Sequence, residues 1–350
     1  MAGALAIRGG DPWPLLELVG RNFSNWLRQD RRLLAMARAG ASWLGGGNTL
    51  HAAADNVRRH YDLDEQLYRQ FLDPDLQYSC AYFRRPSMSL AEAQEAKKRH
   101  LIAKLAIEPG HRVLDMGSGW GGLALSIAES VPGVSVLGVT LSREQLRYAQ
   151  RRARQAGLDD RVRFELCDYR RVEGRFDRIV SVGMFEHVGR SDHATFFHKI
   201  AALLRDEGVA LIHSIARKGR RGGSNPWLNK YIFPGGYIPS LTEIAAAIEG
   251  VDLWITDIEA LRLHYAETLR CWRINFSAHR TSVNGLYGER FCRMWEFYLA
   301  SCEMAFRYGD LMVLQVQLAR RIDALPVTRD YMFDAEREGA AIPLESPLKD

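Results

Sequence analysis

A hydrophobic segment that runs into closely spaced glycines is the clearest chemical feature of this sequence. Residues 113–122 read VLDMGSGWGG, in which Gly117, Gly119 and Gly121 follow Asp115. Glycines at this spacing can adopt positive φ and let the backbone approach a ligand where a β-carbon would clash. The spacing G-x-G-x-G differs from the dinucleotide fingerprint G-x-G-x-x-G. The turn therefore favours S-adenosylmethionine over a nicotinamide dinucleotide as the cofactor.

Strands and helices that alternate along the chain must position this turn. From about residue 92, short apolar runs are separated by longer stretches with helical spacing. Because this is the βαβ repeat, we predict an α/β fold with a doubly wound, mostly parallel sheet. The predicted strands are 112–116, 134–139, 162–166, 177–182 and 209–215, and the predicted helices are 91–105, one after Gly119, 142–156 and 191–204.

The remaining segments extend this core at both ends. A small helical N-terminal region is predicted over residues 1–60, and the main domain over residues 61–350. The helices of the N-terminal region would either pack on the main domain or form an amphipathic cap that faces lipid. Residues 217–240 are rich in Gly, Pro, Arg and aromatic side chains and predict an inserted lid. Helices are predicted over 241–249, 264–280 and 287–307, and a final edge strand over 311–318.

Composition limits the class of protein and its partners. The chain has 350 residues, 47% of them hydrophobic, which is enough for a large core, and its formal charge is only +5. Basic side chains gather around residues 151–154, 161–163 and 217–221, where they can meet anionic lipid headgroups or form a solvated surface. We expect no nucleic-acid partner, and the sequence leaves open whether the protein forms a homodimer.

Cysteine content and hydropathy indicate the compartment. Five cysteines without a C-x-x-C pair predict a reduced environment and no metal site. No segment approaches the roughly 18 apolar residues of a membrane span, and the apolar start is too short for a signal peptide. We therefore expect a cytoplasmic protein with no transmembrane segment, and any membrane contact would be peripheral, at the inner face.

Six separated motifs resemble the cyclopropane fatty acid synthases, including the mycolic acid cyclopropane synthases. Between about residues 56 and 325 they read NVRRHYDLDEQLYRQFLDPDLQYSCAYF, VLDMGSGWGG, GVTLSREQ, GMFEHVG, NPWLNKYIFPGG and HYAETLRCW. The resemblance implies a Rossmann-like methyltransferase domain that uses S-adenosylmethionine and acts on a cis-alkene in phospholipid acyl chains. Where relatives carry a Gly-Asn-containing segment, this chain has DLDEQLY near the acceptor entrance, so substrate detail does not transfer.

The resemblance also implies roles for individual residues. The expected cofactor contacts, including two residues of the glycine turn, are Tyr78, Ser79, Asp115, Gly117, Gly119, Thr140, Leu141 and Gln145. The bicarbonate-binding residues of the family fall on Cys80, Glu186, His213, Ile215 and Tyr265.

The implied chemistry explains why an anion site is needed. Methylation of an alkene gives a carbocation, which closes to a cyclopropane when a base removes a proton from the new methyl group. Bound bicarbonate would serve as that base. We expect Glu186 and His213 to form a proton-sharing set, Tyr265 to donate its hydroxyl, and Cys80 and Ile215 to contribute backbone groups. Seen singly, Glu186 could instead cap a helix and His213 could be a core imidazole.

Several functions fit the same motifs. The leading interpretation is a cyclopropane-fatty-acyl-phospholipid synthase. A fatty-acyl methyltransferase that gives a methyl-branched or methylene product is the nearest rival. A small-molecule amine N-methyltransferase is disfavoured by NPWLNKYIFP and by Tyr265, and a lipid-binding protein without activity would not need both residue sets. Aromatic side chains that could face the sulfonium, or simply pack in the core, are Tyr82, Phe83, Phe185, Tyr231, Phe233 and Trp272.

Overall fold

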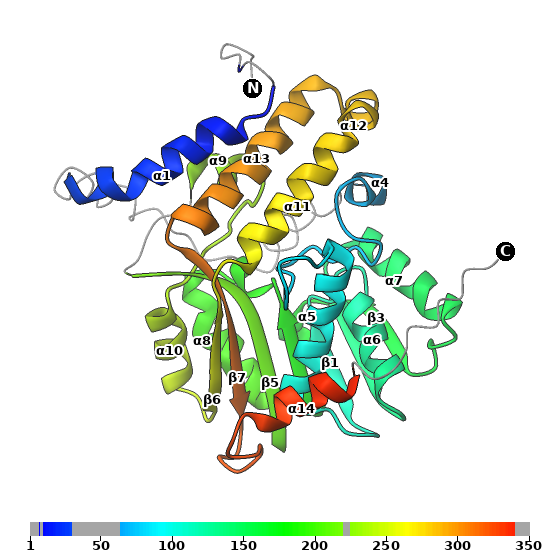
Figure 1. The fold of residues 1–350 in the computed structure, drawn as a ribbon. Coiled ribbons are helices and arrows are strands. Elements are labelled where there is room, and N and C mark those ends of the chain that lie inside the picture. Colours follow the sequence, from blue (N-terminus) through cyan, green and yellow to red (C-terminus); the bar gives the residue numbers. More distant parts are fainter. Residues whose placement is uncertain (1–6, 8–9, 30–63, 220–224, 340–350) are drawn as a thin grey trace.

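A computed structural model describes residue 7 and residues 10–29, 64–219 and 225–339 of the chain (Figure 1). Most of the predicted N-terminal region, 1–60, lies outside these residues. Its described part is helix α1 (Trp13–Gln29), which packs against helix α13 (Glu289–Tyr308). The boundary between the two predicted domains at residue 60 therefore stays a prediction.

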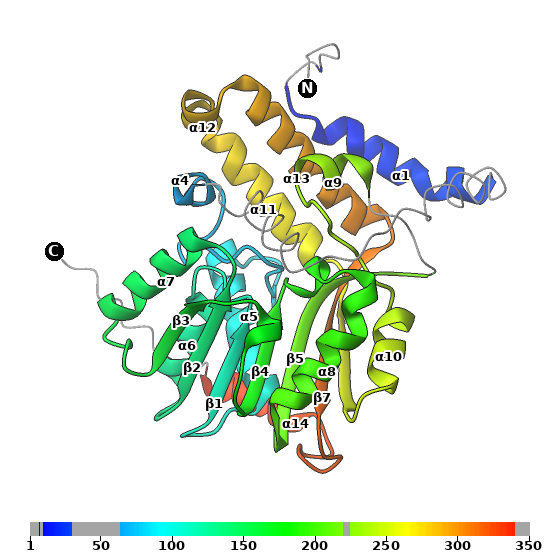
Figure 2. The ribbon, with the colours of Figure 1, turned by 180° about the vertical axis from the view of Figure 1, so that it is seen from behind.

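The predicted α/β fold is confirmed by one seven-stranded sheet with the order β3-β2-β1-β4-β5-β7-β6 (Figures 1 and 2). Strands β1 to β5 run parallel, and β7 is antiparallel to both β5 and β6. Their bounds are β1 Arg112–Met116, β2 Ser135–Thr140, β3 Val162–Leu166, β4 Phe176–Val182, β5 Leu204–Arg217, β6 Trp254–Leu261 and β7 Leu311–Ala319.

The prediction that residues 311–318 form an edge strand is wrong. This segment forms β7 but lies inside the sheet, and the edge belongs to β6, which the sequence did not predict. The pattern of β6 misleads because Trp254 and Ile258 are exposed while Asp257 and Glu259 turn inward to the buried Lys104, at 3.2 and 2.6 Å. Apolar side chains that face solvent and acidic side chains that face inward reverse the alternation that marks a half-buried strand.

Helices cover both faces of the sheet. An apolar cluster on one face unites the sheet with α5 (Leu90–Leu105), α6 (Gly122–Ser130) and α7 (Arg143–Gln155). A second cluster on the other face unites it with α8 (His193–Leu203) and α10 (Leu241–Glu249). The C-terminal helix α14 (Asp330–Gly339) packs on α5. These layers leave the carboxyl ends of the parallel strands free to form a site.

A lobe of helices lies beyond those carboxyl ends (Figure 1). It contains α4 (Glu65–Arg69), α9 (Pro226–Tyr231), α11 (His264–Ala278), α12 (Arg280–Tyr287) and α13. Its core is a cluster of large apolar and aromatic side chains, among them Phe71, Trp272, Trp295 and Tyr298. Helix α9 lies in the segment predicted as a lid and packs on α13, where the Trp227 and Phe297 rings are 4.9 Å apart. Among the described residues, no helix has the length and apolar character of a membrane span.

Candidate active site

The glycine-rich turn after β1 forms one wall of a pocket. Gly117 has φ 84° and Gly119 has φ 52°, so the positive φ predicted from the spacing is confirmed at both residues. A β-carbon at Gly117 would lie 2.8 Å from the side chain of Met184, whereas one at Gly119 would meet no atom within 4 Å. Packing and backbone conformation therefore both require glycine at position 117, and conformation alone requires it at 119.

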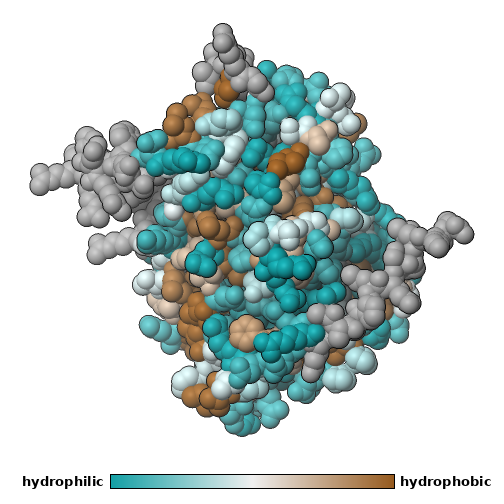
Figure 3. All heavy atoms as spheres, in the orientation of Figure 1, coloured by the Kyte–Doolittle hydropathy of each residue, from teal (hydrophilic) through white to brown (hydrophobic). Residues whose placement is uncertain are grey.

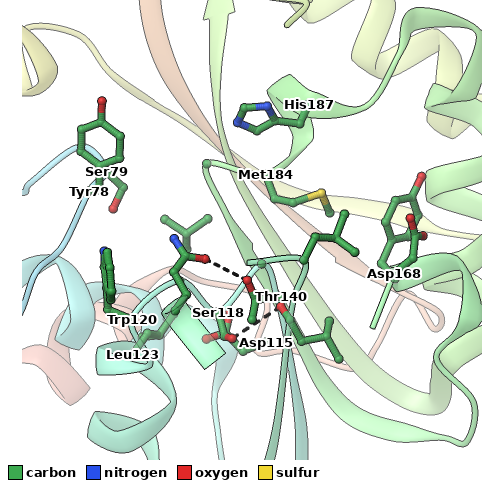
Figure 4. A pocket seen from close by; sticks show the side chains of 18 of the residues that line it. Tyr78, Ser79, Asp115, Ser118, Trp120, Leu123, Thr140, Asp168, Met184 and His187 are labelled. Carbon is green, nitrogen blue, oxygen red and sulfur yellow. Dashed lines mark hydrogen bonds between the residues drawn. The ribbon is translucent and has the colours of Figure 1, made fainter. Parts of the chain in front are cut away.

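The pocket has a volume of about 150 Å³ and lies at the carboxyl ends of β1, β2 and β4 (Figure 4). The structure brings together in its lining all eight residues that the sequence suggested for the cofactor, namely Tyr78, Ser79, Asp115, Gly117, Gly119, Thr140, Leu141 and Gln145. They come from three separate parts of the chain, 78–79, 115–119 and 140–145, so the fold alone makes them neighbours.

Asp115 places an unpaired carboxylate oxygen in this pocket. The residue is 1% exposed, and its Oδ2 has no hydrogen-bond partner in the described part of the chain. Burial raises the pKa of Asp115 to about 7. Since an isolated buried carboxylate is unfavourable, this position suits a ligand that brings positive charge or hydrogen-bond donors. Nearby, the hydroxyl of Thr140 donates to Oε1 of Gln145 at 2.8 Å and so fixes the direction of that amide.

A segment before α5, residues 73–79, closes another side of the pocket. Leu76, Gln77, Tyr78 and Ser79 belong to the lining. The segment is tied down from two helices: Arg152 on α7 donates to Asp75 at 2.5 Å, and Gln94 on α5 donates to the carbonyl of Ser79 at 3.0 Å. These contacts hold the lining residues of the segment in place.

Glu186 lies beside the pocket, on a 3-10 turn that follows β4. Its Oε1 accepts a hydrogen bond from the backbone nitrogen of Ile215 at 2.6 Å, while its Oε2 is buried without a partner in the described residues. Burial raises the pKa of Glu186 to about 7, although the Ile215 hydrogen bond acts in the opposite direction. The carboxyl group can therefore gain or lose a proton near neutral pH.

His213 on β5 presents a second unpaired atom. It is 2% exposed, and its neighbour in the sheet register is Val182, which lines the pocket. The amide nitrogen of Gln315 faces Nδ1 of His213 at 3.2 Å, so Nδ1 accepts and Nε2 bears the ring proton. That Nε2 has no partner among the described residues, and burial lowers the pKa of His213 to about 3. The imidazole is therefore a neutral donor.

Cys80, Ile215 and Tyr265 lie together in the apolar cluster of the helical lobe. Cys80 is 1% exposed, and burial raises its thiol pKa, so the thiol stays protonated. The Tyr265 ring packs against Trp272 and Phe306, with ring centroids 5.8 and 4.7 Å apart. Of the three, Ile215 contacts Glu186 through its backbone nitrogen.

The two groups of predicted residues are neighbours but do not share one lining. Cys80 follows Ser79, and Glu186 precedes His187, and both Ser79 and His187 line the pocket. The five residues of the second group lie outside that lining. The structure shows no hydrogen bond between Glu186 and His213, so the proton sharing expected from the sequence stays a prediction and would need a third group between them.

Comparison with known proteins decides the family. The family model described as mycolic acid cyclopropane synthetase matches residues 48–316. The chain belongs to this family. The cyclopropane-fatty-acyl-phospholipid synthase of Escherichia coli (strain K12) is 43% identical over 266 residues, which cover 76% of this chain and 68% of the relative. A protein of Pseudomonas putida named "Probable fatty acid methyltransferase" is 39% identical over 291 residues, covering 80% of this chain and 74% of the relative.

A solved structure of a similar protein contains the demethylated form of the proposed cofactor. The mycolic acid cyclopropane synthase CmaA1, complexed with S-adenosylhomocysteine and CTAB, is 34% identical and has a TM-score of 0.72, covering 76% of this chain and 97% of that one. Together with the family match, this establishes the present family member as an S-adenosylmethionine-dependent methyltransferase. The geometry of the pocket agrees with the charge of that cofactor, because Asp115 can face its positive groups.

Several lining residues of this cyclopropane synthetase family member escaped the sequence analysis. Trp120, Asp168, Met184 and His187 all line the pocket (Figure 4). Asp168 could have been found from its position just after β3, at the same sheet edge as Asp115. His187 lies within the motif GMFEHVG, next to the candidate Glu186.

The aromatic candidates mostly serve other purposes in this family member. Phe185 is fully buried in the cluster under α8, and Tyr82 stacks on His100 with centroids 4.3 Å apart. Neither of these two rings belongs to the pocket lining, in which Tyr78 and Trp120 supply aromatic faces instead.

Proposed function

We propose that this protein is a cyclopropane-fatty-acyl-phospholipid synthase, which transfers a methylene group from S-adenosylmethionine to the cis double bond of a phospholipid acyl chain. The observation that carries the proposal is a pair of buried polar atoms beside the cofactor pocket, Oε2 of Glu186 and Nε2 of His213, which have no partner in the described part of the chain. Ring closure requires a proton acceptor at this place, as does formation of a methylene product, and product analysis separates the two.

Bicarbonate fits this pair as the third group. Nε2 of His213 is a donor and Oε2 of Glu186 can carry a proton, and neither atom has a partner among the described residues. A small oxyanion accepts such donors well. When bound, bicarbonate would supply a base where the proton leaves the methyl carbon.

Each residue then has a task of its own. Glu186 holds or releases a proton at Oε2, because its pKa of about 7 lies at the working pH. His213 orients the anion through Nε2 and does not protonate, because its pKa is about 3. Cys80 contributes through its backbone, since its thiol is buried and neutral. Tyr265 directs its hydroxyl group to the same anion.

The helical lobe supplies an apolar environment for an acyl chain. Cys80, Ile215 and Tyr265 connect the anion site to the aromatic cluster between α11 and α13. Burial there excludes water, which would otherwise capture a carbocation. The Escherichia coli relative is named for the same class of acceptor, a fatty acyl group of a phospholipid.

We propose further that the lobe side of the molecule meets the inner face of the membrane peripherally. Helix α1 exposes Leu15, Leu18 and Val19, and Figure 3 shows apolar residues gathered over this region. On α9, Tyr231 is 36% exposed and the Lys230 ammonium lies 5.2 Å from its ring centroid. Apolar side chains beside an aromatic ring and a cation suit headgroup depth.

Product analysis tests the proposed reaction. Purified protein is incubated with labelled methyl donor and vesicles of a mono-unsaturated phospholipid, and the released fatty acids are analysed by mass spectrometry. Cyclopropanation adds CH₂ and removes the alkene. Transfer of label to an acyl chain that keeps an unsaturation would refute the synthase assignment and leave the methyltransferase.

A fatty-acyl methyltransferase with a methyl-branched or methylene product is the second candidate. The observation that favours it is the similarity to relatives with such names, including the "Tuberculostearic acid methyltransferase UfaA1" of Mycobacterium tuberculosis, which is 41% identical over 282 residues. The same product analysis separates the two reactions. An amine acceptor has less support, because the coclaurine N-methyltransferase structure is 20% identical and shows the fold alone.

A further inference from the structure

Lys97 is a buried cation behind the cofactor pocket that none of the sequence motifs singled out. It lies on α5 and is 1% exposed. Its Nζ donates to Oγ of Ser79 at 2.9 Å and to Oε1 of Gln77. Both acceptors belong to residues that line the pocket. A lysine is rarely buried so completely, and here its bonds point to the lining rather than to a salt bridge.

The donors and acceptors of this cluster fix the direction of each hydrogen bond. An ammonium group has only donors, so Oγ of Ser79 accepts from Lys97 and its own O–H must donate elsewhere. The amide of Gln77 is used at both ends, because Oε1 accepts from Lys97 and Nε2 donates to Asp75 at 2.9 Å. The hydroxyl proton of Ser79 is therefore left for a ligand in the pocket.

We propose that Lys97 is a positioning residue for the methyl donor, which acts by keeping the Ser79 hydroxyl turned into the pocket as a hydrogen-bond donor. The acceptor that it would meet is an oxygen of S-adenosylmethionine, of which the carboxylate is the strongest acceptor. Gln94, one turn earlier on the same face of α5, supports this arrangement by donating to the carbonyl of Ser79 at 3.0 Å. The inference rests on the assignment of this pocket to the cofactor and is independent of the acceptor alkene.

The surroundings of Lys97 keep it protonated at neutral pH. Burial lowers the pKa of Lys97 to about 8, and the nearby carboxylates of Asp73 and Asp75 act in the opposite direction. The ammonium form therefore predominates at pH 7. In that form the side chain offers no lone pair that could draw the Ser79 proton away from the pocket.

The test compares two buried lysines of the same helix. In Lys97→Met the Ser79 hydroxyl is released, and the affinity for S-adenosylmethionine, measured by calorimetry, is expected to fall roughly 10- to 100-fold. The matched control is Lys104→Met, which is also 1% exposed but pairs with Asp257 and Glu259, outside the pocket lining. It should lower the melting temperature and leave affinity unchanged. Wild-type affinity in Lys97→Met would overturn the proposal.

A double-mutant cycle tests whether Lys97 acts through Ser79. In a Ser79→Ala background, Lys97→Met should weaken cofactor binding far less than it does alone, because the group that it orients is gone. Equal losses in both backgrounds would overturn the proposed route. If Lys97→Met does not fold, Lys97→Gln replaces it with the same expectation, since its carbonyl can draw the Ser79 proton away. Because cofactor binding is the measured quantity, an inactive or differently acting enzyme would not affect the result.

Discussion

Buried polar atoms without a protein partner define the chemistry of individual side chains in this enzyme. Counting only the residues that the structure describes, Asp115, Glu186 and His213 each have one such atom next to or within the site. Burial moves their pKa values in the directions that keep each group uncharged, to about 7 for the two acids and about 3 for the imidazole. Unpaired groups of this kind are unfavourable for folding, so their presence indicates ligands.

Replacement of Glu186 tests its proton-handling role. Glu186→Gln keeps the shape and the hydrogen bond from Ile215 but cannot accept a proton at this position. We expect cyclopropane formation to fall by at least about 100-fold while S-adenosylmethionine still binds. Glu173→Gln, which removes an exposed carboxylate, is the control and should retain full activity. Unchanged product formation in Glu186→Gln would refute the assignment.

The pH profile provides a second test of the same carboxyl group. Because the pKa of Glu186 is raised to about 7, its proton-accepting form is depleted below that pH, and turnover should rise between about pH 6 and pH 8. A bound anion raises this pKa further and moves the midpoint upward. The measurement is made at saturating cofactor, because Asp115 titrates in the same window. A flat profile across this window would contradict the role.

Among the elements, the segment 73–79 and its ties to α5 and α7 decide how the cofactor is enclosed. Arg152 on α7 donates to Asp75 at 2.5 Å and to the carbonyl of the pocket residue Trp120 at 3.4 Å. The cofactor pocket is thus closed on this side by contacts between elements that are far apart in sequence. Opening of the pocket must separate these contacts.

Loss of the contact between α7 and this segment should therefore speed cofactor release. We expect Arg152→Met to raise the dissociation rate of S-adenosylmethionine by roughly tenfold, as measured by stopped-flow fluorescence. Arg147→Met is the control on the same helix, because Arg147 is 67% exposed and its ion pair within the described residues is with Glu144 of α7. Equal rates for the two variants would show that the segment does not limit release.

The strands whose apolar residues face inward could be predicted from the sequence. The predicted bounds of β1 and β3 match the structure residue by residue, those of β4 differ by one residue at one end, and those of β2 differ by one residue at each end. β6 could not be found, because Asp257 and Glu259 face inward to Lys104, a contact that only the folded chain reveals. Long-range ion pairs of this kind leave no periodic signal in a single sequence.

The candidate site was predictable where the residues stand in motifs. The glycine turn and the residues 140–145 follow strands directly, so their place at the sheet edge could be expected. Lys97 gave no such signal, since a lysine in an amphipathic helix normally faces water. Its role depends on the segment 73–79 folding back over α5, which no local pattern indicates.

In the molecule as a whole, the carboxyl ends of the parallel strands and the exposed apolar side chains of α1 lie towards the same end. Helices α1 and α9 both pack on α13, above the carboxyl ends of the strands (Figure 1). The loop between β7 and α14 lies at the opposite end (Figure 1). An acyl chain that enters from the helical lobe would therefore approach from the side that carries Leu15, Leu18 and Val19.

This arrangement predicts that the surface around α1 is the one that binds lipid. Leu18→Glu places a charge on the exposed face of α1 and should weaken binding to anionic phospholipid vesicles by roughly tenfold in a sedimentation assay, with cofactor affinity unchanged. Val327→Glu, at a fully exposed position in the loop between β7 and α14, is the control and should bind vesicles as the wild type does. Identical binding by both variants, or equal turnover on neutral and anionic vesicles, would contradict the proposed orientation.

The fate of the methyl hydrogens tests the proposed reaction most directly. Phospholipid vesicles are treated with the enzyme and a donor whose methyl group is fully deuterated, and the released fatty acids are analysed before and after catalytic hydrogenation. The account predicts a product that keeps two of the three deuterium atoms in a ring carbon and has no alkene left to hydrogenate. A product with all three deuterium atoms in a methyl branch, or one that takes up hydrogen at a new double bond, would contradict it.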